Sequence, residues 1–230
     1  CQGVVAYDSA ATSDVAGNNG TLTIGATGTQ TQAGTCNDSN SASAWYNGRT
    51  GKFNSSLNFD GGDDYVTAGN GASLQSITIG TLSTWVKTTA VGSGDGLQII
   101  NKRNVDGDCS PTLDISAGAT GVANMAADCS VYYTAASGTK NIKDGSWHHI
   151  VGTFDSGVLK IYVDGKLDGT GSWDSRSLGN TNSSWNIGYH GAWNLYFSGQ
   201  IDDVRIYNYS LTPSQVKNVF NEGSAVRFGP

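Results

Sequence analysis

Two adjacent histidines, His148 and His149, lie in the segment WHHIVGTFD, and imidazoles at such a spacing could bind a metal or act as a catalytic base. The surrounding residues are those of a buried strand, in which successive side chains point to opposite faces. The two rings therefore cannot bind one ion together, and catalysis would need a nucleophile beside one of them. We predict that both are hydrogen-bonded packing residues.

A second group of candidate residues is aromatic. The stretch 171–199 concentrates tryptophan, tyrosine and histidine among Asn, Ser and Gly. Flat aromatic rings stack on sugar rings, and amide and imidazole groups hydrogen-bond to hydroxyls. We predict ligand contacts from Tyr189, His190, Trp193, Asn194 and Trp173. The alternative is that Trp193 folds back on the protein, as Trp185 and Phe197 are expected to do in the core.

The remaining titratable residues argue against catalysis and against nucleic-acid binding. Glycosidases need two suitably spaced carboxyl groups, yet the chain has a single glutamate, Glu222, and no aspartate pair stands out in an aromatic cleft. A G-x-S-x-G nucleophile motif is absent from the sequence. The net charge is −6, and lysine and arginine form no basic run. We predict a protein that is not an enzyme and does not bind nucleic acid.

Four cysteines, Cys1, Cys36, Cys109 and Cys129, lack the close spacing of a zinc site. We predict the disulfides Cys1–Cys36 and Cys109–Cys129, because each pair brackets one local segment, although four cysteines allow three pairings. Disulfides indicate an extracellular or cell-surface location. Lipidation of Cys1 is the alternative, and it would leave Cys36 unpaired. No stretch approaches the roughly 18 apolar residues of a spanning helix, so we expect no membrane insertion.

These residues must be positioned by short strands, because the chain contains 32 glycines, only 14% charged residues and regularly spaced apolar runs. Strands are predicted in the ranges 21–26, 56–61, 81–88, 97–102, 149–155, 159–165 and 185–189. Asp164-Gly165 predicts a tight hairpin. One helix is predicted in LTPSQVKNVFNEG, with a capping box from Thr212 to Gln215 and an end at Gly223. We expect a single all-β sandwich over residues 1–230 with one short C-terminal helix.

Several motifs in this order carry a family resemblance: LNFDGGDDYV, DGSWHHIVGTFD, LKIYVDGKLDGTG, NIGY and YFSGQIDDVRIYNYSLTPSQV. From about Val4 to Phe220 the chain resembles the bacterial laminin G-like, concanavalin A-like jelly-roll family. The resemblance implies a two-sheet antiparallel jelly roll, a frequent calcium ion at its edge, and a role as a binding module on secreted or surface proteins. This chain departs from the family at Asn104 to Ser137, and it inserts YHGAWNL where the family keeps a short loop.

The resemblance also implies that the N-terminal loop meets the last strand. Calcium prefers six to eight oxygen ligands, and both segments are rich in carboxylates and amides. We therefore predict one structural calcium site from Asp8, Asp14, Asn19, Asp202 and Asp203. The alternative is that Asp202 or Asp203 pairs with Arg205 or caps a turn. The acidic group in FDGGDDYV, formed by Asp60, Asp63 and Asp64, is expected to form a turn.

The predicted function is a non-catalytic carbohydrate-binding or adhesion module, stabilised by calcium, whose partner is a glycan or a cell-surface polysaccharide. A different class also fits, because a low-charge domain rich in Gly, Thr, Ser and Ala and held by disulfides could be a structural subunit of an extracellular fibre, pilus or adhesin. Such a subunit would self-associate or bind other surface proteins. The sequence does not separate these two functions. A glycan-active hydrolase or lyase is the third and least supported alternative.

Overall fold

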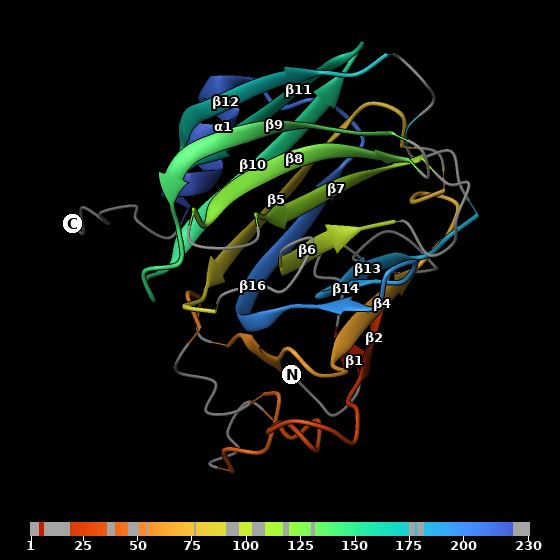
Figure 1. The fold of residues 1–230 in the computed structure, drawn as a ribbon, viewed down its shortest axis with the longest axis vertical. Helices are drawn as coiled ribbons and strands as arrows, with labels where there is room; N and C mark the ends of the chain where they lie inside the picture. The colour runs from red at the N-terminus through yellow and green to blue at the C-terminus, as the bar shows by residue number, and fades with distance from the viewer. Residues whose placement is uncertain are drawn as a thin grey trace, which may run out of the picture.

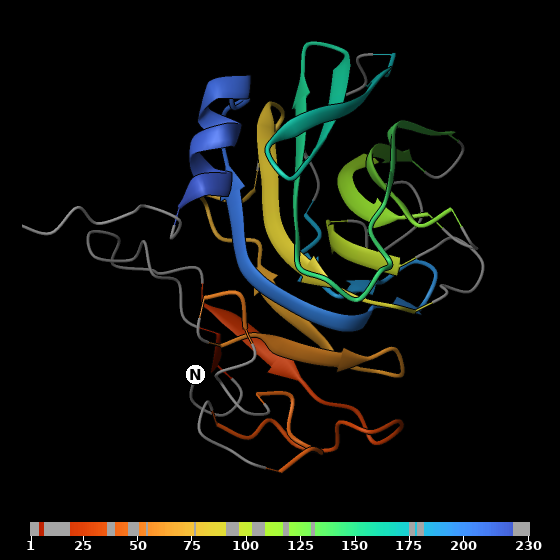
Figure 2. The same cartoon turned by 90° about the vertical axis from the view of Figure 1, so that its left-hand side faces the viewer.

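The structure is a computed structural model that describes residues 5–6, 19–35, 40–45, 51–53, 55–75, 77–90, 97–102, 109–116, 120–129, 132–174, 178 and 182–222. Within this part the chain forms two antiparallel β-sheets that pack face to face, with one helix outside them (Figures 1 and 2). The predicted all-β sandwich with a C-terminal helix is confirmed.

The described strands divide into two large sheets and one small hairpin. The larger sheet runs in the order β1 (Val5–Ala6), β2 (Gly20–Thr23), β4 (Tyr65–Gly69), β13 (Trp185–Ile187), β6 (Leu97–Asn101), β7 (Cys109–Ile115), β8 (Val122–Cys129), β9 (Tyr132–Asn141). The other runs β12 (Lys166–Ser172), β11 (Val158–Val163), β10 (His148–Asp155), β5 (Gly80–Lys87), β16 (Ser198–Tyr207), β3 (Leu57–Asp60). The hairpin pairs β14 (Tyr189–His190) with β15 (Leu195–Tyr196).

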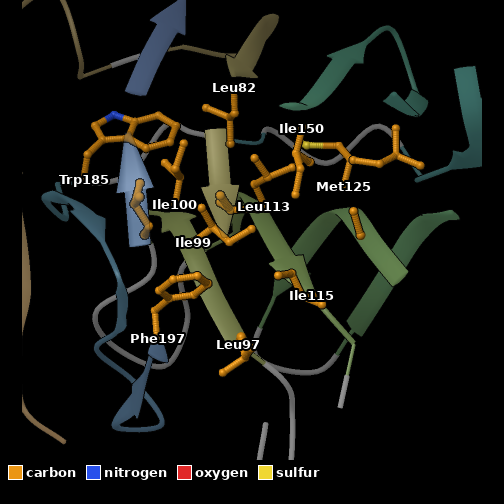
Figure 3. Packing of buried hydrophobic residues seen from close by; sticks show 14 of the residues in the cluster. Leu82, Leu97, Ile99, Ile100, Leu113, Ile115, Met125, Ile150, Trp185 and Phe197 are labelled. Atoms are coloured by element: carbon orange, nitrogen blue, oxygen red, sulfur yellow. The ribbon is translucent and has the colours of Figure 1, made fainter. Parts of the chain in front are cut away.

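The core lies between the two large sheets, because each strand turns alternate residues inward. Figure 3 shows Leu113 and Met125 of the larger sheet close to Leu82 and Ile150 of the other. Trp185 and Phe197 are fully buried in the same cluster, as predicted. Gly152 permits the close approach of the sheets, because a Cβ at that position would lie 2.3 Å from the sulfur of Met125.

The predicted turn and cap are both present. Asp164 and Gly165 adopt positive φ angles of 50° and 75°, as a type I′ hairpin requires. Helix α1 (Pro213–Asn221) begins with the predicted capping box between Thr212 and Gln215. Its buried face packs on the outside of the six-stranded sheet (Figure 2). The predicted helix end at Gly223 lies outside the described residues.

The strands β7, β8 and β9 lie where the sequence departs from its family. A disulfide joins Cys109 to Cys129, the first residue of β7 and the last residue of β8, which confirms one predicted pair. Cys1 and Cys36 lie outside the described residues, so the other pair stays a prediction. At its far edge β9 lies beside β12, the edge strand of the other sheet, so the sandwich is closed along that side.

Candidate functional site

The outward face of β7, β8 and β9 is polar although it is buried. On β8 the side chains of Met125 and Ala127 enter the core, so Asn124, Ala126 and Asp128 point outward. Residues directly opposite each other in an antiparallel pair share a face. The register therefore adds Ser110, Thr112 and Asp114 from β7, and Tyr133 from β9, opposite Asp128. We call these seven residues the polar face.

A carboxylate at one end of the polar face holds a tyrosine from the other end. Asp114 accepts hydrogen bonds from the Nδ2 atom of Asn124 at 2.7 Å and from the hydroxyl of Tyr133 at 3.1 Å. In the register of the strands, Tyr133 is opposite Asp128, whereas Asp114 is opposite Asn124, which lies four residues earlier on β8. The Tyr133 ring therefore extends along the sheet past Ala126, whose small side chain leaves room for it. Tyr133 is 49% exposed, so it presents an aromatic ring to solvent.

A second exposed ring lies on the β14–β15 hairpin. Trp193, at the turn, stacks on His190 with ring centroids 4.5 Å apart and planes inclined by 7°. His190 is fully buried, and its Nε2 atom hydrogen-bonds to Asp128 Oδ2 at 2.8 Å. Trp193 is 39% exposed, because its inner side is covered by His190. An aspartate of the polar face thus supports this ring as well.

Tyrosines fix the base of the same hairpin. Tyr189 stacks between Tyr65 and Tyr196, at centroid distances of 4.8 and 4.7 Å. Its hydroxyl donates to Asn194 Oδ1 at 2.9 Å, and its backbone oxygen accepts from Asn101 at 2.6 Å. These contacts tie the hairpin both to itself and to β6, and they hold the turn that carries Trp193.

Three buried side-chain oxygens of the polar face lack a hydrogen-bond partner among the described residues. The hydroxyls of Ser110 and Thr112 and the Oδ1 atom of Asn124 have no hydrogen-bond partner among those residues. Buried polar groups usually find a partner in the protein, in ordered water or in a ligand. These three oxygens are buried and do not reach the accessible surface of the protein.

The structure distributes the five predicted ligand residues over different positions. Trp193 and Asn194 are exposed on the hairpin turn, whereas Tyr189 and His190 lie beneath them and support the turn. Trp173 follows β12, is buried, and packs in the main core. The sequence motifs did not point to Asp114, Asp128 or Tyr133. The alternation of apolar and polar residues in CSPTLDI and VANMAADC was the signal that could have found the first two.

The predicted calcium ligands of the last strand bond to other groups, although Asp203 Oδ2 has no hydrogen-bond partner among the described residues. Asp202 accepts hydrogen bonds from the backbone nitrogens of Phe53 and Asp203, both at 2.8 Å. Asp203 adopts a positive φ in a bulge of β16 and forms an ion pair with Arg205 at 2.9 Å. Asn19 precedes β2, and Asp8 and Asp14 lie outside the described residues. The predicted meeting of these segments at an ion stays a prediction.

A different carboxylate group is better arranged for a cation. Asp60, Asp63 and Asp64 each offer an oxygen within 4.8 Å of the others, so this cluster could hold a metal ion. Burial and the charge of Asp60 raise the pKa of Asp64 to about 6. Most oxygens accept loop amides, for example Asp60 Oδ2 from Thr29 and Gln30 at 2.7 and 2.8 Å. Asp63 Oδ1 is buried with no partner among the described residues. The turn expected here is thus also a candidate cation site.

The two adjacent histidines are packing residues, as predicted. His148 lies between Asp164 and Asp144, with nitrogen–oxygen distances of 2.9 and 3.1 Å, and hydrogen bonding to Asp164 raises its pKa. His149 points to the other face and hydrogen-bonds to Ser83 at 3.0 Å. Burial lowers the pKa of His149 to about 4, and its Nδ1 atom has no partner among the described residues. It therefore lacks the orienting carboxylate of a catalytic triad.

The described residues form an antiparallel two-sheet sandwich, and a family model matches this chain. Residues 60–217, more than half of the chain, match the Laminin_G_3 model of the concanavalin A-like lectin/glucanase superfamily. The chain therefore belongs to this superfamily, which the resemblance in its motifs had indicated.

Solved structures of glycan-binding domains share the fold. Domain 4 of AbnA, an extracellular GH43 arabinanase from Geobacillus stearothermophilus, in complex with arabinotriose, is 23% identical, with a TM-score of 0.60 over 74% of this chain and 78% of that chain. The CBM40 domain of the Ruminococcus gnavus IT-sialidase, bound to α2,3-sialyllactose, is 14% identical, with a TM-score of 0.58 over 72% and 96%.

A curated relative matches a shorter part of the chain. A stretch of 91 residues is 31% identical to part of the sushi, von Willebrand factor type A, EGF and pentraxin domain-containing protein 1 of Rattus norvegicus. The match takes in 34% of this chain and 2% of that protein, so the chain spans a small fraction of its length. In the described part of the chain, no helix is long and apolar enough to cross a membrane.

Proposed function

We propose that this protein is a non-catalytic, extracellular glycan-binding module whose sugar-binding surface is formed by two exposed rings, Tyr133 of the polar face and Trp193 of the β14–β15 hairpin. One observation carries the proposal: Tyr133 and Trp193 are both exposed, and each is held by a buried aspartate of the same sheet face. Aromatic rings supported in this way can stack on sugar rings at a small cost in conformational entropy.

Binding rather than catalysis is supported by the carboxylates. Asp114 and Asp128 are buried and hydrogen-bonded to Tyr133 and His190, whereas a glycosidase aligns its two carboxyl groups with the scissile bond. The only glutamate, Glu222, forms an ion pair with Arg205 beside helix α1. The Cys109–Cys129 disulfide supports an extracellular location, because disulfides persist in oxidising compartments.

A glycan array tests the proposal with three variants beside the unchanged protein. Trp193→Ala and Tyr133→Ala should each weaken binding by about ten-fold or more, because each removes a stacking surface worth about 1 to 3 kcal/mol. Tyr209→Ala is the matched control, since Tyr209 is 47% exposed but lies after β16 in the other sheet. Equal losses in all three variants, or none, would contradict the proposed surface.

The structural-subunit alternative is tested by the same preparations. A fibre subunit should form higher assemblies on size-exclusion chromatography, whereas a glycan-binding module should elute as a small species and bind sugars. Folded protein that assembles and binds no glycan on the array would replace the proposed function with self-association.

We further propose that calcium stabilises the domain through Asp60, Asp63 and Asp64. Calcium binds carboxylate and carbonyl oxygens, and a cation would offset the burial and the repulsion by Asp60 that together raise the pKa of Asp64. The ion would tie the loop that follows β2 to the turn between β3 and β4, because the amides of that loop already bond to the same carboxylates.

A further inference from the structure

Helix α1 covers a fully buried histidine on the outer face of the six-stranded sheet. The imidazole of His149 contacts the rings of Trp85 and Phe220, with centroid distances of 5.1 and 5.9 Å. Phe220, near the end of α1, also stacks on Trp85 at 5.6 Å. The helix and the histidine therefore share one aromatic contact, so a change at the imidazole acts on the docking of the helix.

The hydrogen bonds of this imidazole suit its neutral form only. Its Nε2 atom bonds to the hydroxyl of Ser83 at 3.0 Å, and its Nδ1 atom is buried without a partner among the described residues. A neutral imidazole has one donor nitrogen and one acceptor nitrogen, and a hydroxyl can satisfy either. Protonation of His149 would make both nitrogens donors. The N–H group at Nδ1 would then have no acceptor, and an unsatisfied buried donor costs free energy.

The surroundings of the ring also disfavour a positive charge. Burial is the largest cause that lowers the pKa of His149 to about 4. The charge of Asp164, in the β11–β12 turn, opposes this shift, whereas the charges of Arg205 in β16 and Lys52 in the 51–53 segment add to it. An imidazolium ring would thus be buried beside two other cations.

Other charged groups on the elements around His149 have their own interactions. Asp203 and Glu222 both pair with Arg205, and Asp202 accepts backbone hydrogen bonds. Lys217, on α1, is exposed. None of these carboxylates bonds to His149 in the described part of the chain, so they do not neutralise a charge on its ring.

The layer that covers His149 is small compared with the core between the sheets. The cluster beneath α1 is separate from the main core, and its buried members are Val151, Tyr162, Leu211, Val216 and Val219. Figure 2 shows α1 on the outside of the sandwich. Units with few buried apolar contacts open at a lower free energy than the whole fold. The helix can therefore separate while the sheets stay packed.

We infer that α1 is a cover that acid releases: protonation of His149 detaches Phe220 and the end of α1 and uncovers the indole of Trp85, while the two-sheet sandwich stays folded. In the released state His149 is hydrated and has its ordinary pKa of about 6.5, above the value in the docked state. The docked state is therefore fully favoured above about pH 6.5, and it weakens as the pH falls toward about 4. Each pH unit in this range lowers the ratio of docked to released helix about ten-fold.

Hydrogen–deuterium exchange of the full chain at about pH 7 and about pH 5 tests the inference, with protection corrected for the intrinsic pH dependence of amide exchange. We expect the protection of the α1 amides to fall by about ten-fold or more at the lower pH. The amides of β7 and β8, in the other sheet, should change by about two-fold at most.

Two variants identify the titrating group. His149→Gln keeps a hydrogen-bonding side chain that cannot be protonated, so its α1 protection should be equal at the two pH values. Glu222→Gln is the matched control, because it removes the carboxylate that pairs with Arg205 at the end of α1. It should keep the pH response of the unchanged protein.

The opposite results would overturn the inference. Equal protection of α1 at both pH values in the unchanged protein would do so, and so would a parallel loss in β7 and β8, because the fold would then open as a whole. A pH response that persists in folded His149→Gln, or disappears in Glu222→Gln, would assign it to another group.

A measurement on the unchanged protein keeps the test valid if His149→Gln does not fold. An NMR titration follows the His149 ring, which should gain its proton over the same pH range in which α1 loses protection. Protonation of the ring while α1 stays protected would overturn the inference.

Discussion

At the scale of single residues, aspartates hold the loops and turns of this protein in position. Asp60, Asp63 and Asp64 accept hydrogen bonds from amides of the loop after β2, and Asp164 accepts one from the backbone of His149 at the start of β10. Each carboxylate fixes several donors at once, because its two oxygens accept about four hydrogen bonds. Residues of this kind do not enlarge the hydrophobic core, yet they determine where the loops lie.

The pair formed by His148 and Asp164 predicts a pH-dependent stability. Hydrogen bonds to Asp164 raise the pKa of His148, so its contribution is complete below the unfolded pKa of about 6.5 and is lost as the pH rises through the folded value. Hydrogen bonds from His148 and Lys140 hold the pKa of Asp164 well below its usual range. That contribution is present above about pH 4 and is lost as the pH falls through the folded value.

The variant His148→Gln should therefore lose more stability at about pH 5.5 than at about pH 8.5, with a difference of about 1 kcal/mol. Urea unfolding of both proteins at the two pH values measures this difference. Asp144→Asn removes only the weaker partner of His148 and should give a smaller difference in the same direction. A stability loss that is independent of pH would mean that the two residues contribute by packing alone.

At the scale of elements, glycines bring the two sheets together along one side. A Cβ at Gly169 of β12 would lie 2.1 Å from the backbone oxygen of Ser137 in β9, and one at Gly171 would lie 2.6 Å from that of Ala135. Backbone atoms cannot move aside as a flexible side chain can. The contact between β9 and β12 thus depends on the absence of side chains at these positions.

Gly169→Ala should lower the free energy of unfolding by about 1 to 3 kcal/mol, because the added methyl group pushes β12 away from β9. Chemical denaturation measures the loss, and Lys166→Ala, an exposed change on the same strand, should cost less than about 0.5 kcal/mol. If both variants were equally stable, β12 would have to tolerate a side chain at this contact, contrary to the geometry.

At the scale of the whole molecule, calcium should raise thermal stability by joining segments that are distant in sequence. At a calcium concentration about 100 times the dissociation constant, binding would add about 2.7 kcal/mol, which is about 5 to 10 °C in Tm for a chain of this size. Differential scanning calorimetry with calcium and with a chelator measures the shift.

Two conservative variants locate the ion. Asp63→Asn should abolish the calcium-dependent shift in Tm, while Asp203→Asn should leave it unchanged. The reverse result would place the ion at the site predicted from Asp8, Asp14, Asn19, Asp202 and Asp203. An unchanged Tm in chelator would show that calcium does not stabilise the protein.

Local patterns in the sequence were sufficient for much of the fold. The Asp164-Gly165 hairpin, the Thr212 capping box and the divergence of His148 from His149 depend only on neighbouring residues, and the structure confirms all three. The strands β7, β8 and β9 were not predicted, because their alanines and polar residues give a weak apolar alternation. Their identity as strands depends on pairing with β6 and with one another.

The sequence by itself determined the class of fold and the aromatic character of the hairpin, because spacing and side-chain chemistry suffice for these. It favoured the Cys109–Cys129 pair among three possible pairings, and the structure confirms that pair. Only the tertiary structure decided that Trp193 is exposed while His190 and Trp173 are buried, and that Tyr133 and His190 both lie beside Asp128. The physical reason is register: pairing of β8 and β9 places Tyr133 opposite Asp128, while the folded hairpin brings His190 to the same aspartate from 62 residues away. No local pattern specifies such contacts.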